Sequence, residues 1–325
     1  KKKDIDSIGV TQMPNNADDF MKLMKDLTKP GQRWGMGCQT PVPWFAGCFG
    51  APNNWGIVNG KLTKDWETPE YKATVAYVRS LWDAGVIFPD SPTLTSNSLT
   101  SNWLANKYTF WLGGFLVYLA TLDRAAGTDP SFQPWTIPPF PHDGKGKATY
   151  PLGNGNSGLM LLKKASDDRV KELLGVLNYL ASPFGTQEAL LLEYGVKDVD
   201  YKLDAKGNPI PTDKGIQDTY IPFRSIAAKP DVILDATSQD FTKNAYQVAQ
   251  QNFTLGIHSA TVGLYSPTDA SKGASLNQAV TDGVQGIIFG RSDVNTLDGL
   301  VKAWQSGGGD QIRSEYEQAL AAAGK

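Results

Sequence analysis

The chain has 325 residues, of which 41% are hydrophobic, and its 31 Lys and Arg against 33 Asp and Glu give a formal net charge of −2. This length allows one large domain or two ordinary ones, and the composition is that of a globular protein. The balanced charge argues against a nucleic-acid-binding surface, which needs clustered basic residues, and no apolar run approaches the roughly 18 residues of a membrane helix.

Helix and strand signals alternate through the first third of the chain. Asn16 is a good helix cap, and the apolar residues after it follow helical spacing up to Leu27. The next elements that we expect are a strand at 34–37, a hairpin with an Asn-Gly turn at 53–62, a helix at 69–82, a strand at 108–112 and a helix at 115–125. Alternation of this kind predicts the α/β class.

The remaining two thirds repeat the pattern less regularly. Ser166 is expected to cap a helix, and residues 211–275 show the weakest periodicity. The other expected elements are an extended stretch at 132–137, a buried strand at 158–162, a hairpin at 201–210 and three closing helices near 276–288, 297–304 and 312–320.

Aromatic residues at strand ends are the best candidates for a ligand site. Gln39, Trp44 and Phe45 belong to a Pro-rich segment that is expected to form a loop after the strand at 34–37. The carboxyl edge of an α/β sheet is where ligands usually bind, and flat rings pack against the apolar face of a sugar. The alternative for Trp44 is a role in the core.

A second group of candidates surrounds the turn at Gly113 and Gly114. Trp111 precedes this turn, and Phe115 and Tyr118 follow it. A glycine turn lets a ligand approach the backbone, so we include Trp111, Gly114, Phe115 and Tyr118 among the ligand-binding candidates. Packing in the core is the alternative for Phe115 and Tyr118.

The stretch from Gly153 to Gly158 spells G-x-G-x-x-G. A dinucleotide site needs a helix directly after this motif, whereas a strand is expected here. A simple turn and a loop at a ligand cleft remain open, and in the cleft Asn154 and Asn156 would bond hydroxyl groups. Arg224 is a further candidate for a sugar acid or paired hydroxyls, with a surface salt bridge as its alternative.

No constellation in the sequence indicates catalysis or a resident metal. There is no nucleophile elbow and no zinc motif, and the acids near Asp204 lack the terminal Glu of a calcium loop. We therefore expect no enzymatic activity and no cofactor.

Five segments in a fixed order carry a resemblance to a known family. They are NADDFMKLMK at 16–25, DAGVIFPD at 83–90, WLGG at 111–114, NYLASP at 178–183 and AWQSGGGDQIRSEYEQAL at 303–320. In this order they resemble the extracellular solute-binding proteins of ABC sugar importers, the maltose-binding-protein-like group. The resemblance runs almost from end to end of the chain.

The resemblance implies a type II periplasmic-binding-protein-like fold with two lobes. Residues 1–133 would belong to the second lobe, 134–190 would return to the first lobe, and 191–325 would complete the second. The opening KKKDIDSIGV is similar to a stretch inside such proteins and is no export signal, so the first lobe is expected to be incomplete in this sequence. The alternative is a natural start at Lys1. A first lobe of this kind would leave the strand at 158–162 and the apolar face of the helix from Ser166 uncovered.

The resemblance also implies the function and its setting. The protein would bind an extracellular carbohydrate, with an oligosaccharide favoured, in a cleft between the lobes. It would close by a hinge and pass the ligand unchanged to an ABC permease. In this group the strand–glycine–aromatic turn faces the cleft, although the usual Trp after the glycines is replaced here by Leu116 and Tyr118. We expect a monomer, periplasmic or held at the cell surface by a lipid anchor. The alternatives are a secreted glycoside hydrolase or lyase, and a binding protein for peptide or another small solute.

Export to an oxidising compartment would also allow the two cysteines to form a disulfide. An even count in an oxidising compartment favours a disulfide between Cys38 and Cys48, and two free thiols are the alternative. Neither histidine lies near them in the sequence, so a metal site is not expected.

Overall fold

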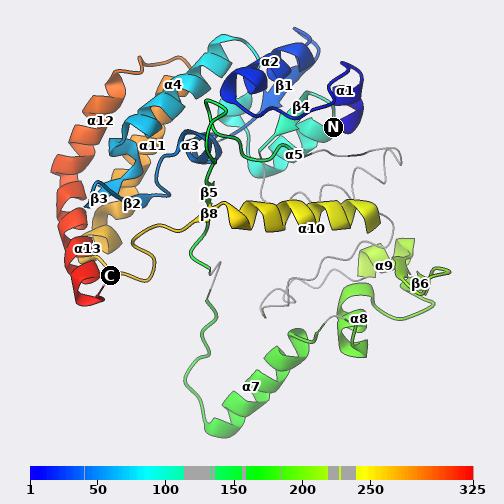
Figure 1. Ribbon diagram of the computed structural model, residues 1–325. Coiled ribbons are helices and arrows are strands. Elements are labelled where there is room, and N and C mark those ends of the chain that lie inside the picture. Colours follow the sequence, from blue (N-terminus) through cyan, green and yellow to red (C-terminus); the bar gives the residue numbers. More distant parts are fainter. Residues whose placement is uncertain are drawn as a thin grey trace. The chain divides into compact units, whose positions relative to one another are not determined.

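The computed structural model describes residues 1–39, 41–112, 133, 136–155, 159–183, 185–218, 227 and 239–324 (Figure 1). These residues divide into two compact units, each described here by itself. Unit 1 contains 1–155 and 248–325, and unit 2 contains 156–247. These units are groups of residues in mutual contact, so the predicted lobe segments 1–133, 134–190 and 191–325 stay a prediction. Phe140 is buried in the core of unit 1.

Unit 1 begins with an α/β layer. Its strands β1 (Trp34–Gly37) and β4 (Tyr108–Trp111) pair in parallel, and Ile87 adds a parallel bridge to Met36. Helix α2 (Ala17–Leu27) covers β1, and its predicted cap is confirmed: the Asn16 side chain accepts a 2.8 Å bond from the backbone N–H of Asp19. The other elements of this layer are α1 (Lys2–Asp6) and α5 (Ser96–Leu104).

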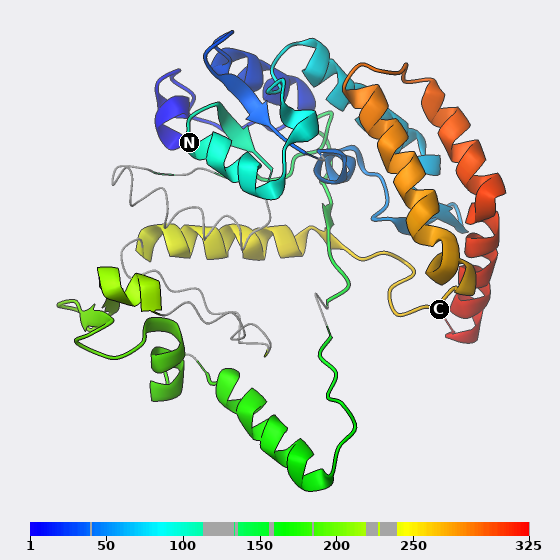
Figure 2. The same ribbon diagram turned by 180° about the vertical axis from the view of Figure 1, so that it is seen from behind.

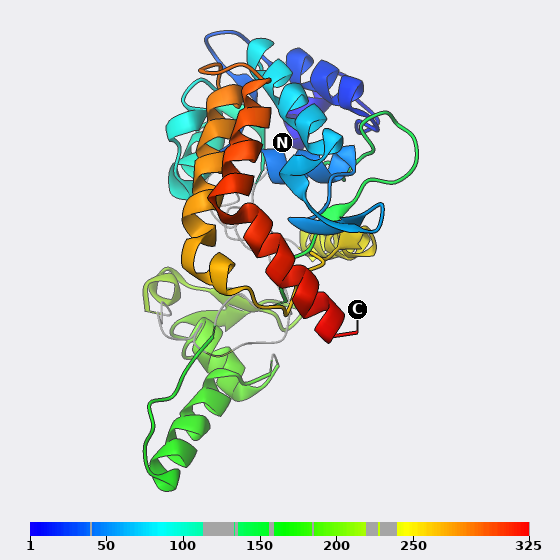
Figure 3. The same cartoon turned by 90° about the vertical axis from the view of Figure 1, so that its left-hand side faces the viewer.

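The rest of unit 1 is mostly helical. Helix α4 (Pro69–Asp83) packs against α3 (Val42–Phe49) and α11 (Ala274–Ile288), and α11 packs against α12 (Thr296–Trp304) (Figures 2 and 3). The last helix is α13 (Asp310–Ala322). The predicted hairpin is confirmed as β2 (Trp55–Val58) and β3 (Lys61–Lys64), with Asn59 and Gly60 in the left-handed conformation that its turn requires.

The core of unit 1 draws on both ends of the chain. Phe20, Phe45 and Val75 from the early helices are fully buried, and so is Ile287 from α11. Four tryptophans are buried in this core or packed against it: Trp55, Trp66, Trp82 and Trp304. Trp304 contacts the rings of both Trp55 and Trp66.

One short sheet joins passages far apart in the sequence. Strand β5 (Tyr150–Pro151) pairs in parallel with β8 (Gly256–Ile257), which follows α10 (Gln239–Thr254). β5 comes shortly before residue 155, where the chain passes into unit 2, and β8 comes shortly after residue 248, where the chain re-enters unit 1.

Unit 2 contains fewer and shorter elements. They are α7 (Asp167–Leu180), α8 (Gln187–Tyr194), the predicted hairpin formed by β6 (Tyr201–Leu203) and β7 (Pro209–Pro211), and α9 (Asp213–Asp218). The carboxylate of Asp204 accepts bonds from the backbone N–H groups of Lys206 and Asn208, both at 2.8 Å, and so holds the hairpin turn. Asp204 therefore has a structural role in the turn.

The predicted strand at 158–162 is wrong for the residues that the structure describes. Residues 159–162 form no strand, and Leu159 and Leu161 are 84% and 88% exposed. The apolar face expected on the helix after Ser166 is uncovered, as predicted: Val170, Leu173 and Leu177 are only half-buried, and Leu174 is 50% exposed.

The helix predicted at 115–125 lies outside the described residues. None of the helices described here has both the length and the apolar character needed to span a membrane.

Candidate functional site

A pocket of about 410 Å³ lies within unit 1. Its volume falls in the range of small-molecule sites, about 300–1,000 Å³. Its wall combines the start of α3, the segment before β2, the end of β3, the β5 and β8 strands and one face of α11. The lining residues are Gln39, Pro41, Val42, Pro43, Ala46, Gly47, Ala51, Pro52, Asn53, Asn54, Lys64, Asp65, Trp66, Tyr71, Thr149, Pro151, Ile257, Asn277, Thr281, Val284, Gln285, Ile288 and Phe289.

Close packing of α3 against the chain before β5 shapes one side of the pocket. The carbonyl of Gly47 accepts bonds from the Thr149 backbone N–H at 3.0 Å and from its hydroxyl at 3.2 Å. A Cβ at position 47 would collide with the Thr149 carbonyl oxygen, so this approach requires glycine. Gly47 thus lets the two segments form one continuous wall.

The side chain of Asn53 fastens the β5–β8 pair to the pocket. Its amide nitrogen donates to the carbonyl of Leu152 at 2.7 Å and to the carbonyl of Ile257 at 2.9 Å. The Ile257 carbonyl also accepts a 3.0 Å bond from the backbone N–H of Leu152, whereas the Leu152 carbonyl has Asn53 as its donor among the described residues. Asn53 therefore holds together the two chain passages that lead to and from unit 2.

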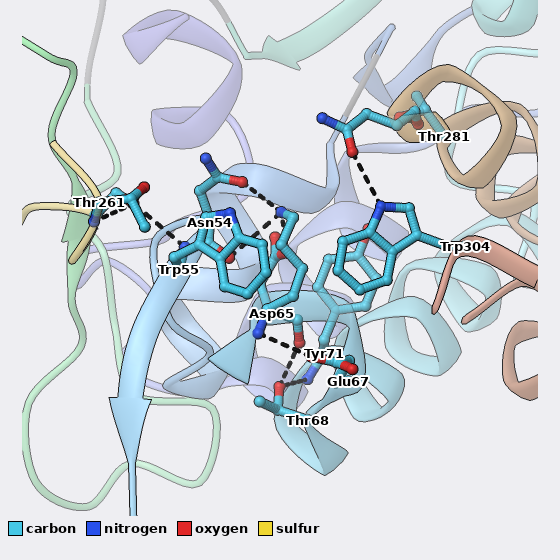
Figure 4. A network of polar contacts seen from close by, with 12 residues as sticks. Asn54, Trp55, Asp65, Glu67, Thr68, Tyr71, Thr261, Thr281 and Trp304 are labelled. Atoms are coloured by element: carbon cyan, nitrogen blue, oxygen red, sulfur yellow. Dashed lines mark hydrogen bonds and ion pairs between the residues drawn. The ribbon is translucent and has the colours of Figure 1, made fainter. Parts of the chain in front are cut away.

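A buried ion pair, Lys64 with Asp65, is part of the pocket lining, and Figure 4 shows Asp65 within its network of polar contacts. The Lys64 ammonium lies 2.6 Å from a carboxylate oxygen of Asp65, and only 3% of its side chain is exposed. It also donates to the side-chain oxygen of Asn54 and, at 3.3 Å, to the Asn54 carbonyl, and it lies 3.6 Å from the centroid of the Trp66 ring. Burial lowers the pKa of Lys64 and raises that of Asp65, and their mutual attraction opposes both shifts.

The face of α11 supplies uncharged polar groups. Asn277, Thr281 and Gln285 are four residues apart, so they lie on one side of the helix and line the pocket together. Asn277 accepts a 3.3 Å bond from the indole nitrogen of Trp304, which fixes the orientation of its amide (Figure 4). Apolar side chains such as Val284 fill the spaces between these groups. An amphipathic wall of this kind suits a ligand with both hydroxyl groups and apolar faces.

Of the residues predicted to bind ligand, Gln39 lies in this pocket and is exposed there. Trp44 does not line it. The expected Pro-rich loop is instead helix α3, which places the half-buried Trp44 ring among Phe20, Phe45, Phe110 and Phe140.

Phe45, which was predicted to bind ligand, lies in the core instead. It is fully buried, and its ring packs edge-on against those of Phe20 and Tyr77. A side chain enclosed by the core has no surface to offer a ligand in this conformation, so Phe45 is a core residue. The helical spacing of Val42, Phe45 and Ala46 was the available signal, and the two prolines around Val42 concealed it.

The other predicted residues lie away from the pocket or outside the described residues. Trp111, at the end of β4, is half-buried against Trp103 with ring centroids 6.0 Å apart. Asn154 is exposed and does not line the pocket. Residues 159–166 form no helix, so the G-x-G-x-x-G stretch lacks the context of a dinucleotide site. The predicted residues outside the description are Gly114, Phe115, Tyr118, Asn156 and Arg224.

The predicted disulfide is not formed. Cys38 and Cys48 are both free thiols buried in the core. Cys38 follows β1, and its backbone N–H donates to the Ser91 hydroxyl at 3.4 Å, whereas Cys48 lies on α3 and its carbonyl accepts from the N–H of His142 at 2.9 Å. Burial raises the pKa of each thiol to about 12. No group of three or more His, Cys, Asp or Glu that could hold a metal occurs in the described part of the chain.

Sequence reasoning missed most of the pocket. Asn53 was predicted only as part of the hairpin at 53–62, and no prediction was made for Lys64, Asp65 or the polar residues of α11. The one available signal was a Lys-Asp-Trp run directly after a strand, which does not reveal by itself that both charges are buried.

The chain is similar to known proteins in sequence and in fold. No family model matches the chain. Lipoprotein LipO of Bacillus subtilis (strain 168) is 24% identical over 335 residues, covering 94% of this chain and 65% of LipO. The polygalacturonan/rhamnogalacturonan-binding protein YtcQ of the same organism is 23% identical over 322 residues, covering 94% of this chain and 64% of YtcQ. The chain thus spans slightly less than two thirds of these relatives.

Solved structures agree along the whole chain. The alginate-binding protein AlgQ2 superimposes with a TM-score of 0.65 at 15% identity, over 98% of this chain and 70% of AlgQ2. The chain has the periplasmic-binding-protein-like α/β fold. An HMO-binding, ABC-transporter-associated solute-binding protein from Bifidobacterium longum infantis gives a TM-score of 0.60 at 14% identity, over 98% of this chain and 71% of that protein. The predicted resemblance to the solute-binding proteins of ABC sugar importers is confirmed.

Proposed function

We propose that this protein binds a carbohydrate in the unit 1 pocket and passes it unchanged to the permease of an ABC importer. The pocket carries the proposal: amide and hydroxyl groups from Asn53, Asn277 and Thr281 alternate with apolar side chains around about 410 Å³. Hydroxyl groups of a sugar need such hydrogen-bonding partners, and its C–H faces need apolar contacts.

The relatives support the same ligand class. The names of YtcQ and of the Bifidobacterium protein give a polysaccharide and an oligosaccharide as ligands, and the latter is associated with an ABC transporter. LipO is named a lipoprotein, which supports a position at the cell surface, outside the membrane, through a lipid anchor. An oligosaccharide, rather than a single sugar, is the ligand that these relatives favour.

The carboxylates of the pocket favour binding over catalysis. A glycoside hydrolase needs two carboxyl groups about 5–10 Å apart. Among the described residues that line the pocket, Asp65 is the only carboxylate, and it is occupied by Lys64 at 2.6 Å. A carboxylate held in an ion pair is poorly placed to act as an acid or a nucleophile.

Binding to a panel of purified oligosaccharides, measured by calorimetry, tests the proposal. We expect one class of saccharide to bind and mass analysis to recover it intact. Gln285→Ala removes a pocket amide and should weaken binding by about 0.5–1.5 kcal/mol, the net value of one hydrogen bond. Gln278→Ala is the matched control, because Gln278 is exposed on α11 and does not line the pocket. Hydrolysed sugar, or binding of peptides in preference to every saccharide, would contradict the proposal.

A further inference from the structure

The charges of the pocket define the class of carbohydrate, an inference that rests on the proposed function. We infer that the pocket selects neutral saccharides and rejects sugars that carry a carboxylate. Lys64 is the only cation among the described lining residues, and it is already paired with Asp65, the only lining anion.

The hydrogen bonds of Lys64 leave no donor for a ligand. A lysine ammonium has three N–H groups. In this pocket they are directed to the Asn54 side-chain oxygen, the Asn54 carbonyl and the Asp65 carboxylate. The ammonium also lies over the Trp66 ring. A ligand carboxylate could reach Lys64 only by displacing one of these partners.

The surroundings of the ion pair are negative as well. Asp269 and Glu67 lie close enough to Lys64 to raise its pKa through their charges, in addition to Asp65. Glu67 is itself paired with Arg313, whereas Asp269 accepts a 2.6 Å bond from the Tyr316 hydroxyl. An incoming carboxylate would therefore meet carboxylates that repel it, at the one place where the pocket has an ammonium.

The N-terminus of α3 is the feature of the wall that could favour an anion. Two of the residues at this end are Pro41 and Pro43, which have no N–H to offer. A helix dipole changes binding by about fivefold at an exposed site and by about thirtyfold at most in a partly buried one. A carboxylate that leaves water without a paired cation loses far more than this, so the helix end does not reverse the preference.

The uncharged amide side chains of the pocket also favour a neutral ligand. Asn53 and Asn277 are held in place by their bonds to Ile257 and Trp304, and Gln285 and Thr281 add further uncharged donors and acceptors. These groups suit hydroxyl groups, which both donate and accept. The inferred ligand thus differs from the uronate polymers in the names of YtcQ and AlgQ2.

Matched saccharides provide the test. The full chain is titrated with oligogalacturonate, with the same oligomers fully methyl-esterified, and with a panel of neutral and uronate oligosaccharides. We expect at least one neutral saccharide to bind and every uronate to bind about tenfold more weakly or not at all. A uronate that binds as tightly as the best neutral sugar would overturn the inference and leave the proposed function intact. If no saccharide binds, the proposed function fails, and the inference fails with it.

Asp65→Asn tests the role of the ion pair. It leaves the Lys64 charge unmatched, so uronate binding should rise about tenfold or more relative to neutral sugars, and this gain should shrink in high salt. Asp298→Asn is the control, because it breaks the exposed pair with Lys72 away from the pocket and should leave the preference unchanged. The double variant Lys64→Met with Asp65→Leu keeps the pocket neutral, which provides a second measurement if Asp65→Asn does not fold. It should keep the neutral preference, and a switch to uronates would contradict the inference.

Discussion

The side-chain amide of Asn53 donates a 2.9 Å hydrogen bond to the backbone carbonyl of Ile257, a residue 204 positions further along the chain. The same amide bonds the carbonyl of Leu152 at 2.7 Å, so one side chain connects the end of β5 with the end of β8. Both strands lie in unit 1, so this side chain ties together two passages of that unit that are far apart in the sequence.

Asn53→Ala should therefore destabilise unit 1. It leaves the Leu152 carbonyl without its donor, which costs about 1–3 kcal/mol when the group is not resolvated, while the Ile257 carbonyl keeps its bond from the Leu152 N–H. Urea unfolding measures the change. Asn97→Ala, at an exposed position of α5, should stay within about 0.5 kcal/mol of the parent protein. Equal stability of the two variants would show that water replaces the Asn53 bonds.

Trp44→Ala should affect stability more than binding. The half-buried ring contacts Phe20, Phe45, Phe110 and Phe140, so its removal should lower the free energy of unfolding by about 1–3 kcal/mol. Ligand affinity should change little, since Trp44 does not line the pocket. Trp111→Ala should be milder, because Trp103 is the ring that Trp111 contacts among the described residues. Lost affinity with unchanged stability would restore the ligand role that the sequence suggested.

Thiol titration checks the state of the cysteines. Under denaturing, non-reducing conditions the protein should show the free thiols of both Cys38 and Cys48. In the native state both should react slowly near neutral pH, because burial raises the pKa of each to about 12 and leaves little thiolate. Absence of free thiol after denaturation would instead support a disulfide.

Glu315 should make stability depend on acidity. Its carboxylate accepts hydrogen bonds from the Ser266 hydroxyl, the Gln311 amide and Thr268, which lower its pKa from 4.5 to about 2. A carboxyl group whose pKa is lower in the folded state stabilises the protein fully above pH about 4.5, and this stabilisation is lost as the pH falls through about 2.

The variant Glu315→Gln should flatten this part of the pH profile, as followed by the thermal midpoint. Glu317→Gln is the control on the same helix, because Glu317 is exposed and has no hydrogen-bond partner among the described residues. If both variants titrate like the parent protein, the contacts of Glu315 do not contribute to the acid response.

The sequence predicted the regular elements well where local chemistry determines them. Asn16 and Thr68 cap their helices, and the Asn59-Gly60 turn forms the β2–β3 hairpin. Apolar spacing found the three closing helices. These signals depend on neighbouring residues, so they can be read from the chain alone.

Two kinds of element were not predicted correctly. Some depend on contacts between residues distant in sequence, and one helix has a composition that is more typical of a loop. Helix α3 contains Pro43 and Gly47, and the sequence therefore suggested a loop. Residues 159–162 have the apolar run of a strand but no partner strand in the described chain, because strand formation needs a neighbour as well as a pattern. The site was missed for the same reason: Lys64, Asn277 and Ile257 meet only once distant segments have packed.

The core of unit 1 combines residues from early and late parts of the chain, and this affects folding during synthesis. Val75 and Phe45 lie in the same core as Ile287 of α11, so residues 1–155 cannot complete this core until α11 has left the ribosome. Contacts of such wide sequence separation slow folding, and the waiting segment exposes hydrophobic side chains meanwhile. Production of this protein should therefore respond to chaperones that hold nascent chains, and more strongly when translation is slow.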